Sequence, residues 1–455
     1  MLSWSILVAL ALLTGGGVWK SRERRRQRLR SWAAAVERCA LTDVEVPRPA
    51  GPLRMTAFSG RLKVRFSEYA AYVPSARATY ERHTGTRVVI ESPQQEFAVH
   101  LRLETLVGNG GGVEIELGDS TFDRAFHVGG GPARAFAALD RPVRGQLVAL
   151  ADGRTLEVSG RFFTVELAED HAGGAAAVPH VVARQLDLAH RLVDHTDVAE
   201  RLAQNALDDA CVEVRLNNLL TLAREFPDSA VTASALRTAC SDPVPEIRRR
   251  AALALGDEGR PVLRALLDSE ADDLCMARTV ATLALELPAE RTLSILERAL
   301  RGRCLETARA CLDVLGRRGD PTTIPVLAKV LAVELRSEIG VAAASALGSM
   351  SHPQAEEPLA KALRYESAEL RIAAAQALGR VGSVAAVVPL KDCAANDKRD
   401  RELERAVRQA ISEIQSRATG ASPGQVSLTG SETGQLSIPE GTSGRVSLDD
   451  SRDET

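Results

Sequence analysis

Aromatic residues are scarce in this chain. Phe, Trp and Tyr make up 4% of the 455 residues, whereas hydrophobic residues of all kinds make up 45%. Alanine and leucine must therefore fill most of the interior, which is typical of helices packed closely through small side chains. A chain of this length has room for two or three domains, each with its own core.

The usual catalytic and metal-binding patterns are also missing. The sequence has no C-x-x-C pair, no H-E-x-x-H and no G-x-S-x-G, which argues against zinc chemistry and serine hydrolysis. His190 and His195 are five residues apart and lie on different helix faces. The glycines at 108–112 precede a strand, and the turn at 129–132 lacks the lysine of a P-loop. We therefore predict no catalytic residue, no metal, no cofactor and no small-molecule substrate.

Strong net charge is absent as well, since the formal charge is −3, and this makes nucleic acid an unlikely partner. The seven cysteines are odd in number, and most fall within helical segments, so we expect reduced thiols rather than disulfides. The preference for Arg over Lys, with abundant Ala, suggests a bacterial genome rich in GC.

A long uncharged run stands at the N-terminus, over residues 1–18, and a basic cluster follows from Lys20 to Arg30. As a helix the run spans about 27 Å, near the lower limit for a bilayer. A secretory signal would place its positive charge before the apolar run. We predict a single-pass anchor at 1–19, inserted through residues 2–19, in the bacterial inner membrane, followed by a basic juxtamembrane helix or linker at 20–46. The basic cluster favours a cytoplasmic location for the bulk of the chain; the alternatives are a cleaved or oppositely inserted segment and a peripheral helix.

Residues 47–170 change to a period of two, which predicts a small α+β domain with an antiparallel sheet. We expect one hairpin between residues 97–103 and 113–117, another between 155–158 and 162–167, and short helices at 132–139 and 142–150. The string Gly118-Asp-Ser-Thr-Phe-Asp-Arg-Ala-Phe-His-Val128 resembles a signature of uncharacterised bacterial membrane-tethered proteins, a resemblance that implies no activity. Its phenylalanines fit a turn packed on the sheet, with Asp123 as a cap or as a partner of Arg124. The alternative is a binding or enzymatic site, lyase-like or of another kind, formed by Asp119, Asp123, Arg124 and His127. A flexible joint at 172–177 and a helix at 179–207 should complete the segment 171–207.

A helical block recurs seven times within residues 208–416. The blocks end at Ala223, Gly256, Glu286, Gly316, Gly348, Gly379 and Ser412, with spacings of 33, 30, 30, 32, 31 and 33 residues. Each block has an apolar stripe at i, i+4, i+7 and i+8, and six of the seven begin with a glutamate where a helix N-terminus favours negative charge. The glycines at the block ends are expected to be helix C-caps with positive φ. Hairpins of about 31 residues must stack to bury their apolar faces, so the array predicts an α-solenoid.

Two blocks carry a family resemblance. Glu246-Ile-Arg-Arg-Arg-Ala-Ala-Leu-Ala-Leu-Gly256 and Glu369-Leu-Arg-Ile-Ala-Ala-Ala-Gln-Ala-Leu-Gly379 resemble the short bacterial HEAT repeats named after phycobilisome lyases. This resemblance implies a surface that binds other proteins. The fold class is therefore predicted as α+β followed by all-α, and the function as a non-enzymatic, membrane-tethered scaffold for protein ligands.

Two sets of residues are candidate partner-binding sites. The first is a basic ridge along the solenoid, formed by Arg215, Arg248, Arg249, Arg278 and Arg371. These arginines could bind acidic protein, lipid or nucleic acid, or they could simply pair with nearby glutamates. The second lies in the tail at 417–455, which we expect to be disordered and which repeats G-[QR]-[VL]-S-[LI] three times. Its paired apolar residues suit a strand that is added to a sheet edge; they are Val426, Leu428, Leu436, Ile438, Val446 and Leu448. The alternative is that a low-complexity sequence produces such repeats by chance.

Overall fold

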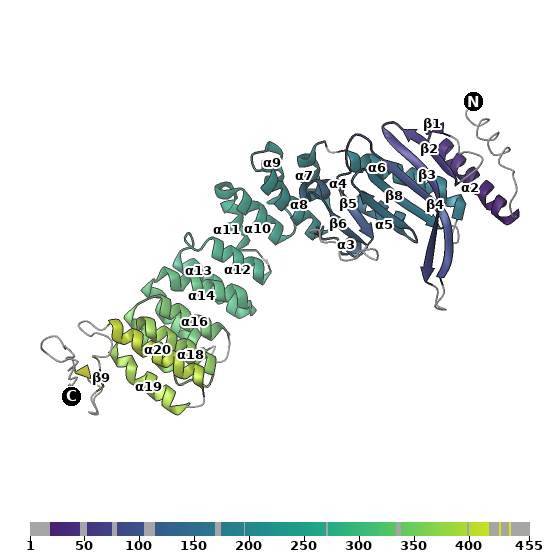
Figure 1. Cartoon of the computed structure of the whole chain (residues 1–455). Coiled ribbons are helices and arrows are strands. Elements are labelled where there is room, and N and C mark those ends of the chain that lie inside the picture. Colours follow the sequence, from purple (N-terminus) through teal and green to yellow (C-terminus); the bar gives the residue numbers. More distant parts are fainter. Residues whose placement is uncertain are drawn as a thin grey trace, which may run out of the picture. The chain divides into compact units, whose positions relative to one another are not determined.

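The structure is a computed structural model that describes residues 19–45, 52–74, 80–103, 114–168, 174–194, 196–269, 272–333, 338–397, 400–417, 427–428 and 436–437. It divides into two compact units, Met1–Arg260 and Pro261–Thr455, which are shown in Figure 1. The anchor expected at 1–19 falls almost entirely outside the described residues. Within the described ranges, no helix combines the length and apolar character that crossing a bilayer requires.

The first unit contains an eight-stranded antiparallel sheet in the order β1-β2-β3-β4-β8-β7-β5-β6. Alternate residues along the central strands, such as Val88 and Ile90, are fully buried, as the period of two predicts. The strands are β1 (Thr42–Glu45), β2 (Arg54–Ser59), β3 (Leu62–Pro74), β4 (Tyr80–Glu91), β5 (His100–Leu103), β6 (Phe126–Gly129), β7 (Thr155–Ser159) and β8 (Phe162–Ala168).

One predicted hairpin is confirmed and the other is wrong. β7 and β8 pair around the turn at Gly160, whose φ is +56°. β5, however, pairs with β7 and β6, while Ile115 donates its N–H to the carbonyl of Val128 on β6 at 2.9 Å. Alternation alone does not specify which strand is the partner, and here the string at 118–128 supplies the strand β6 that takes this position.

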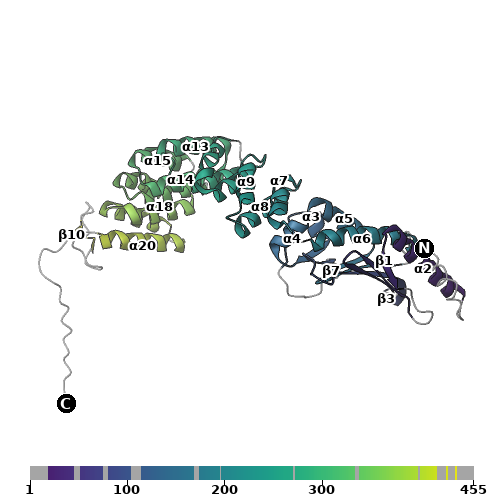
Figure 2. The ribbon, with the colours of Figure 1, turned by 90° about the horizontal axis from the view of Figure 1, so that it is seen from above.

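Helices cover one face of the sheet, as Figure 2 shows for α2, α5 and α6. α2 (Trp19–Arg38) lies in the segment assigned from sequence to a juxtamembrane linker, yet it buries Trp32 against Phe66 of the sheet, with ring centroids 5.6 Å apart. The indole Nε1 of Trp32 donates to Thr86 at 3.1 Å. The other helices of this layer are α4 (Pro132–Ala138), α5 (Arg141–Ala151), both close to prediction, and α6 (Val178–Val193).

β3 and β4 are longer than their neighbours. β2 pairs with β3 only as far as Ser67, and β8 pairs with β4 only as far as Gly85. The remaining residues of β3 and β4 pair with each other alone up to Pro74 and Tyr80. The result is a two-stranded ribbon that projects from the sheet (Figure 1).

The single helix expected at 179–207 is two helices. α6 ends at Val193, Asp197 adopts the left-handed conformation with φ +54°, and α7 (Val198–Asp208) follows. α6 packs on the sheet and α2, whereas α7 packs on α4 and on the first helix of the repeats. The chain thus turns between two packing partners, which an unbroken helix could not reach.

The repeat region confirms the predicted helical hairpins. The first helices of the blocks are α8 (Val212–Glu225), α10 (Pro245–Ala254), α12 (Asp273–Thr282), α14 (Leu305–Arg318), α16 (Glu338–Ser349), α18 (Ala368–Val381) and α20 (Arg401–Arg417). The second helices are α9 (Ala230–Ala239), α11 (Arg260–Leu266), α13 (Ala289–Gly302), α15 (Ile324–Val333), α17 (Glu356–Ala362) and α19 (Val387–Asn396). Within the second unit, α12, α14, α16, α18 and α20 pack in succession as one layer.

Three of the four glycines at the block ends are not helix C-caps. Gly256 does have positive φ, but Gly316, Gly348 and Gly379 lie inside α14, α16 and α18. A Cβ on Gly348 would lie 2.7 Å from the Cβ of Ala377 in the next repeat. Equivalent approaches exist from Gly316 to Ala346 and from Gly379 to Ala410. These glycines are needed because the backbones of successive helices approach too closely for a side chain.

The third block is two residues out of register with the sequence alignment. Its Leu285, expected in the buried stripe, is 96% exposed, and α12 already ends at Thr282. The buried residues of α12 match those of α14 at an offset of 32, with Leu283 corresponding to Leu315. The true block end is therefore Ala284, which places Arg278 two positions away from the ridge arginines.

Candidate partner-binding surface

The ridge arginines on α8 and α10 form contacts within the repeats. Arg215 is 8% exposed; its Nε and Nη2 donate to the carboxylate of Asp242 at 3.1 and 3.2 Å, and its Nη1 donates to the carbonyl of Asp209. Arg248 donates to the carbonyl of Asp242 at 2.7 Å. Arg215 thus connects α8 to the loop that leads into α10, and Arg248 connects α10 to the same loop.

Arg249 is buried and donates twice to Glu246, at 2.8 and 2.6 Å, while Arg250 donates to the same carboxylate at 2.9 Å. Burial alone would raise the pKa of Glu246, but the hydrogen bonds and positive charges of the two arginines lower it to about 2. A carboxylate with this pKa stays ionised at neutral pH and holds both guanidinium groups locally.

The last two ridge arginines differ from each other. Arg371 donates to Asp397 at 2.7 Å and to the carbonyls of Tyr365 and Glu366. Arg278 is exposed on α12, outside the register of the others. The contacts of four of the five arginines thus favour the local-pairing interpretation, and Arg278 differs from them in being exposed.

A buried ion ladder connects the α+β domain to the first two repeats inside the first unit. Arg144 of α5, which is 2% exposed, donates to Asp119 at 2.8 Å and to both oxygens of Asp209 at 3.0 and 3.2 Å. Arg215 continues the ladder from Asp209 to Asp242. Because bidentate pairs fix geometry as well as charge, the ladder fixes the start of the solenoid on this domain.

The string at 118–128 lies at the same junction. Gly118 has φ +95°, and a Cβ there would come within 2.5 Å of the Cβ of Glu213 in α8. Asn217 of α8 donates to the carbonyl of Leu117 at 3.1 Å. The string therefore packs directly against the first repeat, which supports its structural interpretation.

Its aromatic residues are confirmed as core residues. Phe122, on α3 (Ser120–Asp123), and Phe126 are each 1% exposed and stack with ring centroids 4.9 Å apart. Asp119 caps α3 by accepting from the N–H groups of Thr121 and Phe122. Aromatic packing and a capped turn together account for the spacing of the string.

The four polar residues proposed for an enzyme site contact separate groups. Asp123 accepts from the N–H groups of residues 117 and 118, and burial raises its pKa. Arg124, expected as a possible partner of Asp123, instead donates to the carbonyl of Ser120, and His127 lies 3.3 Å from Glu114. Asp119 binds Arg144. Since these side chains do not converge on one group, the geometry gives no support to catalysis here.

A groove of about 470 Å³ crosses α12, α14 and α16 in the second unit. Small residues form its floor, and longer side chains border it. The lining residues are Leu274, Ala277, Arg278, Ala281, Glu306, Arg309, Ala310, Asp313, Ala342, Ser345, Ala346 and Ser349. Small side chains on three adjacent helices leave a hollow that a protruding segment of another protein can fill.

The border of this groove is mixed in charge and contains an apolar anchor. Leu274, which lines the groove, is 47% exposed. Arg309 lies 3.4 Å from Glu306, and Asp313 pairs with Arg317, which lies one turn further along α14. Exposed pairs of this kind contribute little to stability and can exchange partners when a ligand binds.

Sequence reasoning did not identify this groove, although a signal is present. In the corrected register, two positions of each block face outward, the sixth and the third before the block end. They are Arg278 and Ala281 on α12, Ala310 and Asp313 on α14, and Ala342 and Ser345 on α16. Small residues at solvent-facing helix positions indicate a hollow, but only after the register of the third block is known.

The tail residues are described only in part. Ser427–Leu428 (β9) and Leu436–Ser437 (β10) pair antiparallel, with Leu428 opposite Leu436. The described residues of the first two copies of the tail motif thus pair with each other. Val426, Ile438, Val446 and Leu448 lie outside the described residues.

Comparison with known proteins gives one family match. Residues 335–412 match the model for HEAT repeats. No curated protein matches the chain. Among solved structures, human deoxyhypusine hydroxylase in complex with glycerol is similar, at 18% identity over 48% of this chain and 96% of that chain, with a TM-score of 0.20. The family match covers α16 to α19 and most of α20, where the structure has stacked helical hairpins, so this segment is similar to HEAT repeats.

Proposed function

We propose that this protein is a membrane-tethered scaffold that binds a protein ligand through the groove on α12, α14 and α16. The observation that carries the proposal is the groove itself, where Leu274 is 47% exposed beside small residues on three stacked helices. Solenoids of stacked repeats present extended surfaces of this kind to protein ligands. An apolar anchor within a polar border is the arrangement expected of an interface centre and its rim.

The proposal includes a location. The uncharged run at 1–18 and the basic cluster after it support a single-pass anchor in a bacterial inner membrane, with the bulk of the chain in the cytoplasm. A cysteine introduced for Ser451 should react with an impermeant maleimide only after the membrane is opened. Labelling of intact cells would place the repeats on the other side.

The ligand proposal is tested by affinity purification of the full chain and three variants. Leu274→Asp removes the anchor and Ser349→Trp obstructs the groove; each should lower recovery of a specific partner about tenfold or more, the effect of losing an interface anchor. Val388→Asp is the matched control, because Val388 is 42% exposed on α19, outside the groove. Equal recovery with all four proteins would exclude the groove as the ligand site.

A further inference from the structure

A second groove, of about 430 Å³, lies on the other helix layer of the second unit, between α13 and α15. Its apolar residues are Leu296, Leu300, Val326, Val330 and Val333. Leu296 and Val330 form a buried floor, whereas Val333 is 68% exposed at the end of α15. A large exposed aliphatic side chain next to an apolar floor is a surface that is stabilised when another apolar segment covers it.

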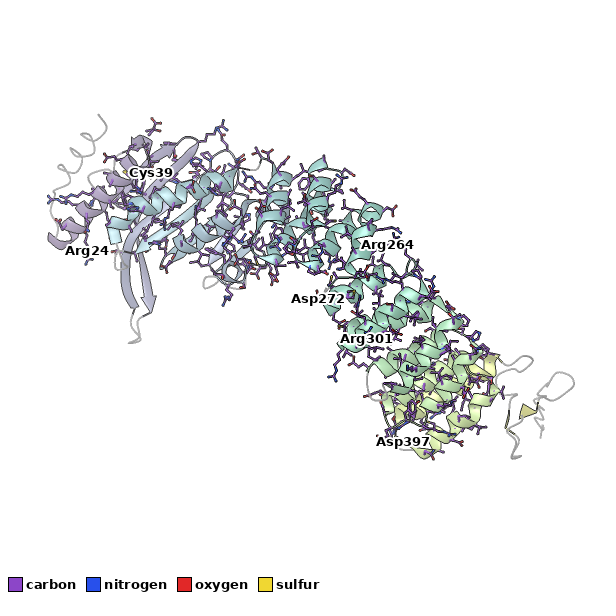
Figure 3. The ribbon with its side chains drawn as sticks, turned by 180° about the vertical axis from the view of Figure 1, so that it is seen from behind. Arg24, Cys39, Arg264, Asp272, Arg301 and Asp397 are labelled. Atoms are coloured by element: carbon purple, nitrogen blue, oxygen red, sulfur yellow. The ribbon has the colours of Figure 1, made fainter. Side chains whose placement is uncertain are left out.

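The border of this groove carries charge. Arg301, labelled in Figure 3, and Lys329 both line it, together with Glu297. The lining residues therefore have a net charge of +1, and the two cations come from the two different helices. An occupant that combines apolar residues with carboxylates matches this surface.

We propose that the third copy of the tail motif, at residues 444–450 of the same chain, binds in the α13/α15 groove. This copy places Val446 and Leu448 on one face when extended, and two carboxylates, Asp449 and Asp450, follow directly. The first two copies pair with each other through Leu428 and Leu436 and lack a following acidic pair. The third copy is thus the one whose chemistry matches both the apolar floor and the basic border.

The tail has the length that this contact needs. From α20, the path to α15 passes over α18 and α16, which pack in sequence; at about 10 Å for each helix the span is about 30 Å. With the first two copies paired, Ser427 lies 10 positions after Arg417, and Val446 lies 9 positions after Ser437. A random-coil chain of this total length has a root-mean-square extension of about 24 Å and a maximum of about 60 Å. The span of about 30 Å lies slightly above the root-mean-square value and at about half of the maximum, so this length of chain can reach the groove at a favourable effective concentration.

The experiment uses full-length protein with a photoreactive benzoylphenylalanine in place of Ser447, which lies between Val446 and Leu448, so that both apolar residues are kept. Mass spectrometry should locate the cross-links within residues 296–301 and 326–333. The same label in place of Thr442, upstream of the motif, is the matched control and should give less than a third of that yield. A mixture of light and heavy-isotope protein separates cross-links within one chain from those between chains.

Two further variants test the contact itself. Val446→Ser with Leu448→Ser should lower the specific cross-link about 30-fold, in proportion to the lost apolar burial. Val333→Asp with Lys329→Glu changes only the exposed groove border, and far-UV circular dichroism checks that the repeats stay folded; it should lower the cross-link similarly. Cross-links spread evenly over the surface, cross-links mainly between chains, or yields unchanged in both variants would overturn the proposal. Because the proposed ligand groove uses the other helix layer, recovery of a partner does not depend on this result.

Discussion

Replacing Gly348 by alanine should destabilise the solenoid, although the same change in most helices is stabilising. The new Cβ would lie 2.7 Å from the Cβ and 2.8 Å from the Cα of Ala377. Relieving such an overlap requires α16 and α18 to move apart, at a cost of about 1–3 kcal/mol. Alanine gains about 1 kcal/mol over glycine in a helix, so the difference is a net loss of about 0–2 kcal/mol in the free energy of unfolding, and we expect about 1 kcal/mol.

Gly145→Ala is the matched control. Gly145 lies inside α5, and a Cβ there has no neighbour within 4 Å. This variant should therefore gain about 1 kcal/mol through helix propensity alone. The two substitutions should therefore change the free energy of unfolding in opposite directions.

Urea unfolding followed by circular dichroism measures both variants, and hydrogen exchange of the α16 and α18 amides locates the effect. Exchange should accelerate in these helices in Gly348→Ala, because local opening exposes their shared face. If Gly348→Ala is as stable as wild type or more so, the close approach of the two helices is not what requires glycine, and the reasoning on Gly316 and Gly379 fails with it.

Two more predictions concern charged residues. Arg215→Met should destabilise the first unit by about 3 kcal/mol, because it leaves the buried carboxylate of Asp242 without its ion-pair partner. Replacement of the exposed Arg278 by Met is the control and should change stability by less than about 0.5 kcal/mol. Equal urea midpoints for the two variants would refute the ladder as a structural element. Glu246 has its pKa lowered from 4.5 to about 2, so its ionised form stabilises the fold fully above about pH 5, and this stabilisation is lost as the pH falls toward 2. The stability difference between wild type and Glu246→Gln should therefore shrink over that range in urea titrations at successive pH values, and a difference independent of pH would contradict the assignment.

The sequence by itself determined the repeat architecture, because each helix must bury an apolar stripe and a stripe with a period of 3.6 can be read from residue types alone. The glutamates at helix starts, the hairpin of β7 and β8, and the short helices after Pro132 and Asp140 followed from equally local rules. Each of these features depends on residues that are neighbours in the chain.

Only the tertiary structure decided the features that depend on distant neighbours. The partner of β5 was set by the strand β6, and the role of Gly348 by the distance to Ala377 in another repeat. From the sequence, Arg215 is expected at the surface; in the folded chain it bonds to Asp242, which lies 27 positions later. The groove likewise required the register of α12, which a one-dimensional alignment misplaced by two residues because Leu285 and Leu283 have the same side chain. Burial separates these two leucines, and burial is a property of the packed helices rather than of the residue type.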